Sequence, residues 1–134
     1  MPQGNVLIVE DDDSIRSLLI DYLKEHGTVT VEGARDGVDA LHHVTTKKYA
    51  AVILDLMMPY MTGIDFLDSL AAMTSDPSVK NINDLPAVIV ITGASVEQVP
   101  NSAVQERFPT IVRRVFRKPL DVGELARCVE ALMG

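Results

Sequence analysis

Residues 51–55, AVILD, decide the fold of this 134-residue chain. Four apolar residues run without a polar break into an aspartate, a pattern typical of a strand buried on both faces of a parallel sheet. Two further runs of this kind are Val6–Val9 and Ala87–Ile91. Thr28–Glu32 alternates like a strand nearer a sheet edge, and Ile111–Phe116 is interrupted by two arginines. The sequence therefore predicts five strands.

Between these runs, apolar residues recur at helical spacing. The predicted helical stripes are Ile15, Leu18, Leu19, Tyr22 and Leu23; Val38, Leu41 and Val44; Ile64, Leu67, Leu70 and Ala71; and Leu125, Cys128, Val129 and Leu132. Aspartates at the expected N-caps are Asp12 or Asp13, Asp36 and Asp121. A further helix is predicted within Ser95–Phe108, where Pro100 would break or restart it. Alternating strands and helices predict an α/β, doubly wound, five-stranded parallel sheet with helices on both faces, as one domain over residues 1–134.

Composition restricts the possible partners. The net charge is −7, from 19 acidic and 12 basic residues, which argues against direct binding to nucleic acid or an anionic membrane. Cys128 is the single cysteine, so it cannot form an internal disulfide, and we expect it to be a small core residue. The N-terminal sequence lacks the basic region of a signal peptide, and no apolar run approaches the ~20 residues of a membrane span. These features predict a soluble, cytoplasmic protein.

Polar residues follow four of the five predicted strands. Glu10 and Asp11 come after the first strand, Asp55 after the third, Thr92 after the fourth and Lys118 after the fifth. Since the carboxyl ends of parallel strands share one edge, we expect these side chains to converge there. Two carboxylates about 5 Å apart repel by roughly 3 kcal/mol at an effective dielectric near 20. Three of them require a cation, and hard oxygen ligands suit Mg²⁺.

The same set of residues suits phosphoryl transfer. Lys118 supplies an ammonium group, and Thr92 supplies a hydroxyl that can donate to an anionic oxygen. Together with Mg²⁺ they would offset the charge of a phosphoryl group while Asp55 attacks as the nucleophile. The predicted product is an aspartyl phosphate on Asp55.

Four segments in chain order, VLIVEDDDSIR, VILDLMMPYMTGIDF, VIVITG and VFRKPL, carry a family resemblance. The chain resembles the receiver domain of bacterial two-component response regulators, of the chemotaxis-regulator type. That resemblance implies a flavodoxin-like receiver fold and phosphotransfer from a histidine kinase or phosphotransfer protein to Asp55. It implies a phosphorelay component that is not an enzyme, with at most slow autophosphorylation from small donors and slow autodephosphorylation. Phosphorylation would then switch a surface that binds a downstream partner or a second copy of the chain.

The resemblance also implies a role for each site residue. Asp11 and Asp55 match direct Mg²⁺ ligands, and Glu10 matches a ligand that acts through water. Met57 matches the position that offers its backbone carbonyl to the metal. Thr92 matches the switch hydroxyl, and Lys118 matches the lysine that pairs with the phosphoryl group.

The sequence departs from the family pattern in three places. Val115 stands where the family often has an aromatic switch residue, and strand alternation predicts that Phe116 points to the opposite face. The segment Met73–Leu85 is long and polar, like an insertion, and Ser95–Arg114 is also longer than usual. A basic patch is predicted from Arg113, Arg114 and Arg117, either as a solvated turn or as a docking surface for an acidic partner or a dimer mate.

Two other functions compete with phosphoacceptance. A phosphatase or phosphomutase with an aspartyl intermediate would need a second aspartate two residues after the nucleophile, where this chain has Met57. A degenerate receiver, acting as a phosphorylation-independent binding module, would have lost carboxylates, the threonine or the lysine, and this chain retains them. Nucleotide binding is disfavoured because neither glycine-rich phosphate-binding motif follows the first strand.

Overall fold

The computed structural model describes residues 4–26, 30–56, 63–73, 86–93, 106–118 and 121–133. Within them, strands and helices alternate as the sequence predicted as far as the fourth strand. Most of the helix predicted between the fourth and fifth strands lies outside the described residues. The strands are β1 (Asn5–Val9), β2 (Thr30–Ala34), β3 (Ala51–Asp55), β4 (Ala87–Thr92) and β5 (Val112–Arg117). The helices are α1 (Asp13–His26), α2 (Gly37–Thr46), α3 (Gly63–Met73) and α5 (Val122–Met133). None of the helices in these ranges is long and apolar enough to cross a membrane.

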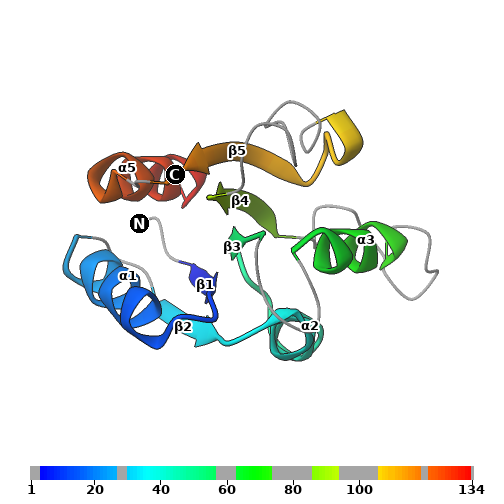
Figure 1. Ribbon diagram of the computed structural model, residues 1–134, viewed down its shortest axis with the longest axis horizontal. Coiled ribbons are helices and arrows are strands. Elements are labelled where there is room, and N and C mark those ends of the chain that lie inside the picture. Colours follow the sequence, from blue (N-terminus) through cyan, green and yellow to red (C-terminus); the bar gives the residue numbers. More distant parts are fainter. Residues whose placement is uncertain are drawn as a thin grey trace.

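The five strands form one parallel sheet in the order β2-β1-β3-β4-β5. Figure 1 shows α1 and α5 together on one side of this sheet and α2 and α3 on the other. The predicted doubly wound architecture with helices on both faces is therefore confirmed. The strand order reverses between β1 and β3, and this is where ligands bind in open α/β sheets.

The position of each strand explains its residue pattern. Every residue of β3 is buried, and so are all but the first of β1 and β4, because helices cover both faces of these central strands. The edge strands β2 and β5 mix buried, intermediate and exposed positions. Arg113 occupies an irregularity in β5, where Val112 pairs with Val88 and Arg114 pairs with Ile89. A bulge of this kind, with exposed arginines, makes an edge less prone to backbone pairing with a strand of another chain.

The core is divided by the sheet into two apolar clusters. One lies under α2 and α3 and includes Phe66, and the other lies under α1 and α5 and includes Leu125. Val115 packs against the first cluster, whereas Phe116 belongs to the second. The prediction that these neighbours point to opposite faces is confirmed. Cys128 packs half-buried against the second cluster, and burial raises the pKa of its thiol, so it is a poor nucleophile.

Aspartates cap three helices. The Asp12 carboxylate accepts from the backbone N–H groups of Ser14 and Ile15 at 2.9 and 3.1 Å. Asp36 accepts from the N–H of Asp39 at 2.8 Å, and Asp121 from that of Glu124 at 3.1 Å. Each carboxylate satisfies a donor that the first helical turn leaves without a partner. The structure confirms the caps at Asp36 and Asp121 and selects Asp12 over Asp13.

Several local predictions differ from the structure. Strand β2 ends at Ala34 rather than Glu32, because Gly33 and Ala34 continue to pair with β1. Strand β5 begins at Val112 rather than Ile111, which is buried but precedes the strand. Leu18 and Val38 are exposed, at 62% and 58%, although both fit helical apolar stripes.

Other predictions fall outside the described residues. They are the greater part of the predicted insertion Met73–Leu85, most of the predicted helix within Ser95–Phe108 including Pro100, and Met57.

Phe66 provides a direct test of this core, because its side chain is fully buried. Phe66→Ala should lower the free energy of unfolding by about 3–5 kcal/mol, through lost burial and the cavity that remains. Leu18→Ala is the matched control on an exposed site and should change it by no more than about 0.5 kcal/mol. Urea unfolding followed by circular dichroism measures both. Equal losses of unfolding free energy in the two variants would contradict the placement of Phe66 in the core and Leu18 on the surface.

Candidate functional site

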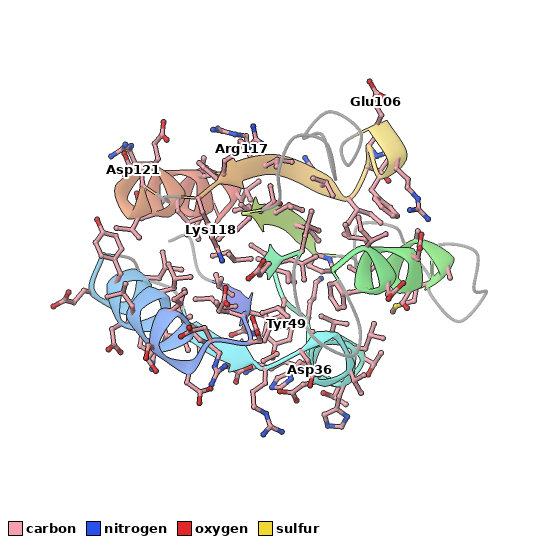
Figure 2. All side chains as sticks on the ribbon, viewed as in Figure 1. Asp36, Tyr49, Glu106, Arg117, Lys118 and Asp121 are labelled. Atoms are coloured by element: carbon pink, nitrogen blue, oxygen red, sulfur yellow. The ribbon has the colours of Figure 1, made fainter. Side chains whose placement is uncertain are left out.

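The predicted site residues lie at the carboxyl edge of the sheet. Glu10 follows the last residue of β1, Asp55 ends β3 and Thr92 ends β4. Lys118 follows the last residue of β5 and extends toward β1 and β3 (Figure 2). Asp55 pairs in register with Ile91, so Thr92 lies one step beyond its level on the neighbouring strand. Parallel pairing brings together residues that are up to 108 positions apart in the chain.

Three carboxylates form the centre of the site. Oxygen atoms of Glu10, Asp11 and Asp55 all lie within 4.8 Å of one another. Glu10 and Asp55 are buried, while Asp11 is exposed. This set offers hard anionic oxygens from two strand ends and remains open to solvent on one side. It fits Mg²⁺, which takes one or two carboxylates and retains several of its waters.

Burial and crowding change the acidity of Glu10. Burial, the hydrogen bond with the Asp55 carboxyl and the charge of Asp55 together raise the pKa of Glu10 to about 8. The backbone N–H of Asp12, which donates to Glu10 Oε1 at 3.2 Å, and the charge of Lys118 act in the opposite direction. Without a cation, the site therefore holds less than its full negative charge near neutral pH.

Lys118 provides the cationic side of the site. Its Nζ atom lies 3.3 Å from Asp55 Oδ2 and 4.0 Å from Glu10 Oε2. Its backbone N–H donates to the carbonyl of Thr92 at 3.0 Å, which ties the ends of β5 and β4 together. A Cβ at Gly93 would make only an ordinary van der Waals contact with Lys118 Cδ, at 3.4 Å, so the position of the lysine does not depend on this glycine. The tie between the ends of β5 and β4 places the lysine next to the carboxylates.

Gly63 supports the segment that carries Asp55. A Cβ at Gly63 would lie 2.7 Å from Leu56 Cα and 2.9 Å from the carbonyl oxygen of Asp55. The Gly63 N–H donates to the Leu56 carbonyl at 3.1 Å, and the Leu56 N–H donates to the Ile91 carbonyl at the same distance. The start of α3 therefore packs directly against the end of β3, and only glycine fits this close approach.

The structure thus brings together Glu10, Asp11, Asp55 and Lys118 as predicted, and it buries Thr92 at the adjoining strand end. Sequence reasoning missed Arg16, whose guanidinium donates to the backbone carbonyl of Glu10 at 2.8 Å. The sequence gives little indication of this role, because an arginine on the first turn of a helix is typical of an ordinary surface charge.

Comparison with known proteins agrees with this geometry. A family model described as the response regulator receiver domain matches residues 6–130. The chain belongs to the response regulator receiver family. It is similar to a probable chemotaxis protein CheY of Rhizobium etli, with 31% identity over 129 residues that cover 96% of this chain and 92% of that protein. As a receiver domain, it is a module of two-component signalling.

Solved receiver structures resemble the fold closely. A response regulator receiver protein from Pseudomonas putida is 27% identical, with a TM-score of 0.77 and coverage of 96% of this chain and 97% of that one. The response regulator protein TrrA from Thermotoga maritima is 25% identical, with a TM-score of 0.73 and the same coverage. The TrrA structure is a complex with Mg²⁺-BeF.

The close approach at Gly63 predicts a measurable cost for a single methyl group. Gly63→Ala should lower the free energy of unfolding by about 1–3 kcal/mol, because the added Cβ overlaps backbone atoms of residues 55 and 56. Gly93→Ala is the matched control, since its Cβ would make only an ordinary contact at 3.4 Å. Chemical unfolding curves compare the two. A Gly63→Ala protein as stable as Gly93→Ala would contradict the packing described at the end of β3.

Proposed function

We propose that this receiver domain accepts a phosphoryl group on Asp55, with Mg²⁺ bound by the acidic cluster. The observation that carries the proposal is the convergence of three carboxylates within 4.8 Å, with Lys118 Nζ 3.3 Å from Asp55 Oδ2. The donor would be a phosphohistidine on a histidine kinase or phosphotransfer protein. An Asp55 carboxylate oxygen would bond to phosphorus as the P–N bond breaks, and the imidazole nitrogen would keep that electron pair.

Each side chain has a distinct role in this proposal. Asp11 and Asp55 would bind Mg²⁺ directly, Glu10 would act through a metal-bound water, and Met57 would offer its backbone carbonyl. The bound metal would offset charge on the incoming phosphoryl oxygens. Lys118 would hold one of these oxygens from the β5 side, where it already contacts Asp55. Preorganised charges of this kind act strongly in a partly buried site because they need no reorganisation during transfer.

Support for Asp55 as the acceptor comes from its surroundings. Its side chain is 3% exposed, so the group that receives phosphorus is shielded from bulk water on the side of the core. Asp11, by contrast, is exposed, which leaves an open approach for a donor from the solvent side. As a receiver domain the chain is a signalling module, and we expect only slow transfer from small donors and slow autodephosphorylation.

Thr92 would connect phosphorylation with a surface change. Phosphorylation adds about −1.5 to −2 charges and three acceptor oxygens. The Thr92 hydroxyl would turn toward these oxygens. The backbone carbonyl of Thr92 already accepts a hydrogen bond from the N–H of Lys118. Movement at this point would reach the end of β5. Val115, which pairs with Val90 within this strand, stands where the family often has an aromatic residue. The switch would therefore act through the strand ends and not through an aromatic rotamer at that position.

The readout surface would include the outer edge of β5. Arg113, Arg114 and Arg117 are all exposed there, although the whole chain carries a net charge of −7. We propose that this edge docks an acidic surface, on a downstream protein or a second copy of the chain. Sedimentation with and without a phosphoryl donor distinguishes the two, because only self-association changes the mass of the purified protein.

Intact-mass measurement tests the phosphoacceptor role. With acetyl phosphate and Mg²⁺, the protein should gain one phosphoryl group, and the gain should disappear with a chelator. Asp55→Asn should abolish it, because the amide is a poor nucleophile of almost the same shape. Asp65→Asn, at an exposed carboxylate on α3, is the matched control and should leave the gain intact.

Two outcomes would overturn the proposal. A phosphoryl gain that persists in Asp55→Asn would place the acceptor elsewhere. No gain in the folded wild-type protein would favour the degenerate receiver, which binds its partner without phosphorylation.

A further inference from the structure

Arg16 is a charged residue of α1 that the phosphoryl chemistry does not use, yet its side chain is only 16% exposed. One guanidinium nitrogen, Nη1, donates to the backbone carbonyl of Glu10 at 2.8 Å. The other, Nη2, is hydrogen-bonded to the Asp13 carboxylate. Arg16 therefore reaches back along the chain, past Asp11, to the residue that follows β1. Planar guanidinium groups are suited to fixing two acceptors at once.

The neighbouring strand provides the space for this arginine. A Cβ at Gly33, on β2, would lie 2.9 Å from Arg16 Cδ and 3.3 Å from Arg16 Cγ. The same Cβ would lie 3.1 Å from Ile20 Cδ1. Glycine at position 33 thus leaves room for the Arg16 side chain where it passes β2. Glycine otherwise weakens a strand, and the close approach of a side chain is one of the uses it has there.

Contacts on both sides fix the backbone of Glu10. Its N–H donates to the carbonyl of Ala34 on β2 at 3.1 Å, and its C=O accepts from Arg16. The carbonyl of Glu10 belongs to the peptide that joins it to Asp11. Holding that peptide plane fixes the positions of the Asp11 nitrogen and Cα, so only rotation about the N–Cα bond is left to change the direction of the Asp11 side chain. Arg16 thereby restricts the orientation of the exposed member of the acidic cluster.

We propose that Arg16, with the space left by Gly33, is a positioning residue for the Mg²⁺ site. It would act on the metal through the backbone of Glu10 and Asp11 and not by contact. This inference rests on the proposed function, since it concerns the metal that serves phosphorylation of Asp55. Outer groups that orient metal ligands commonly change metal affinity by about 10–100-fold when they are mutated.

Positioning and simple charge predict opposite signs. Arg16 is a cation near a cation-binding cluster, so its charge alone opposes Mg²⁺. If charge were its only effect, removal of the guanidinium would tighten Mg²⁺ binding. If it positions Asp11, removal would weaken binding despite the loss of a repelling charge. The sign of the change therefore separates the two effects.

The test is the Mg²⁺ dissociation constant, measured by isothermal titration calorimetry on the unphosphorylated full chain. Arg16→Met should weaken binding by roughly tenfold or more. Arg16→Lys keeps the charge and a single ammonium group as donor and should recover part of the affinity. Lys24→Met, at an exposed residue of the same helix, has the same net charge as Arg16→Met and should leave the affinity close to that of the wild type.

Gly33→Ala provides a second route that leaves Arg16 in place. The added Cβ would displace the arginine side chain, so Mg²⁺ binding should weaken in the wild-type background. It should cause no further loss in the Arg16→Met background, where the long charged group is absent. This double-mutant cycle reports coupling and not a general loss of stability.

If Arg16→Met binds Mg²⁺ as tightly as Lys24→Met or more tightly, the inference is overturned. The proposed function is unaffected by that result as long as the wild-type protein binds Mg²⁺. Failure of the wild-type protein to bind Mg²⁺ would overturn both. If Arg16→Met does not fold, Gly33→Ala decides, and unchanged affinity in that variant would overturn the positioning role.

Discussion

Repulsion among three carboxylates is the constraint on which the site depends. Oxygens of Glu10, Asp11 and Asp55 approach within 4.8 Å, and two of these side chains are buried. One such pair costs about 3 kcal/mol at an effective dielectric near 20. Lys118 offsets part of this cost at 3.3 Å from Asp55, and proton binding at Glu10 offsets another part. The remaining negative charge can bind a cation, and the bound cation can in turn attract a phosphoryl group.

The rest of the fold holds these charges together. Apolar clusters on both faces of the sheet keep β1 and β3 side by side, so that their carboxyl ends cannot separate. Gly63 lets α3 pack against the end of β3, and Lys118 is tied through its backbone to Thr92. The packing of the two apolar clusters thus offsets the repulsion among the three carboxylates. Stability and function are expected to oppose each other at this edge of the sheet.

Sequence patterns were informative where burial was complete. The residues of β3 are apolar because both faces are covered, so AVILD indicated a central strand directly. Edge strands carried a weaker signal, and the end of β2 was misplaced because Gly33 reads as a strand breaker although it continues the ladder. Leu18 fitted a helical stripe yet faces solvent. Convergence of Glu10, Asp55 and Lys118 followed from parallel topology alone. The contact of Arg16 with Glu10 depends on the course of one long side chain past Gly33, which hydrophobic periodicity does not encode.

The most direct test of the central constraint is thermal unfolding of the wild type and Asp55→Asn, each with a chelator and with Mg²⁺. Removal of one carboxylate should relieve repulsion in the metal-free protein. Asp55→Asn should therefore melt a few degrees higher than the wild type when the chelator is present. A change of about 1 kcal/mol in the free energy of unfolding shifts Tm by roughly 2–8 °C. Mg²⁺ should raise the Tm of the wild type more than that of the variant, because Mg²⁺ binds three carboxylates more tightly than the two that remain in Asp55→Asn. A variant that melts below the wild type without metal, or equal Mg²⁺ shifts in both proteins, would contradict the account.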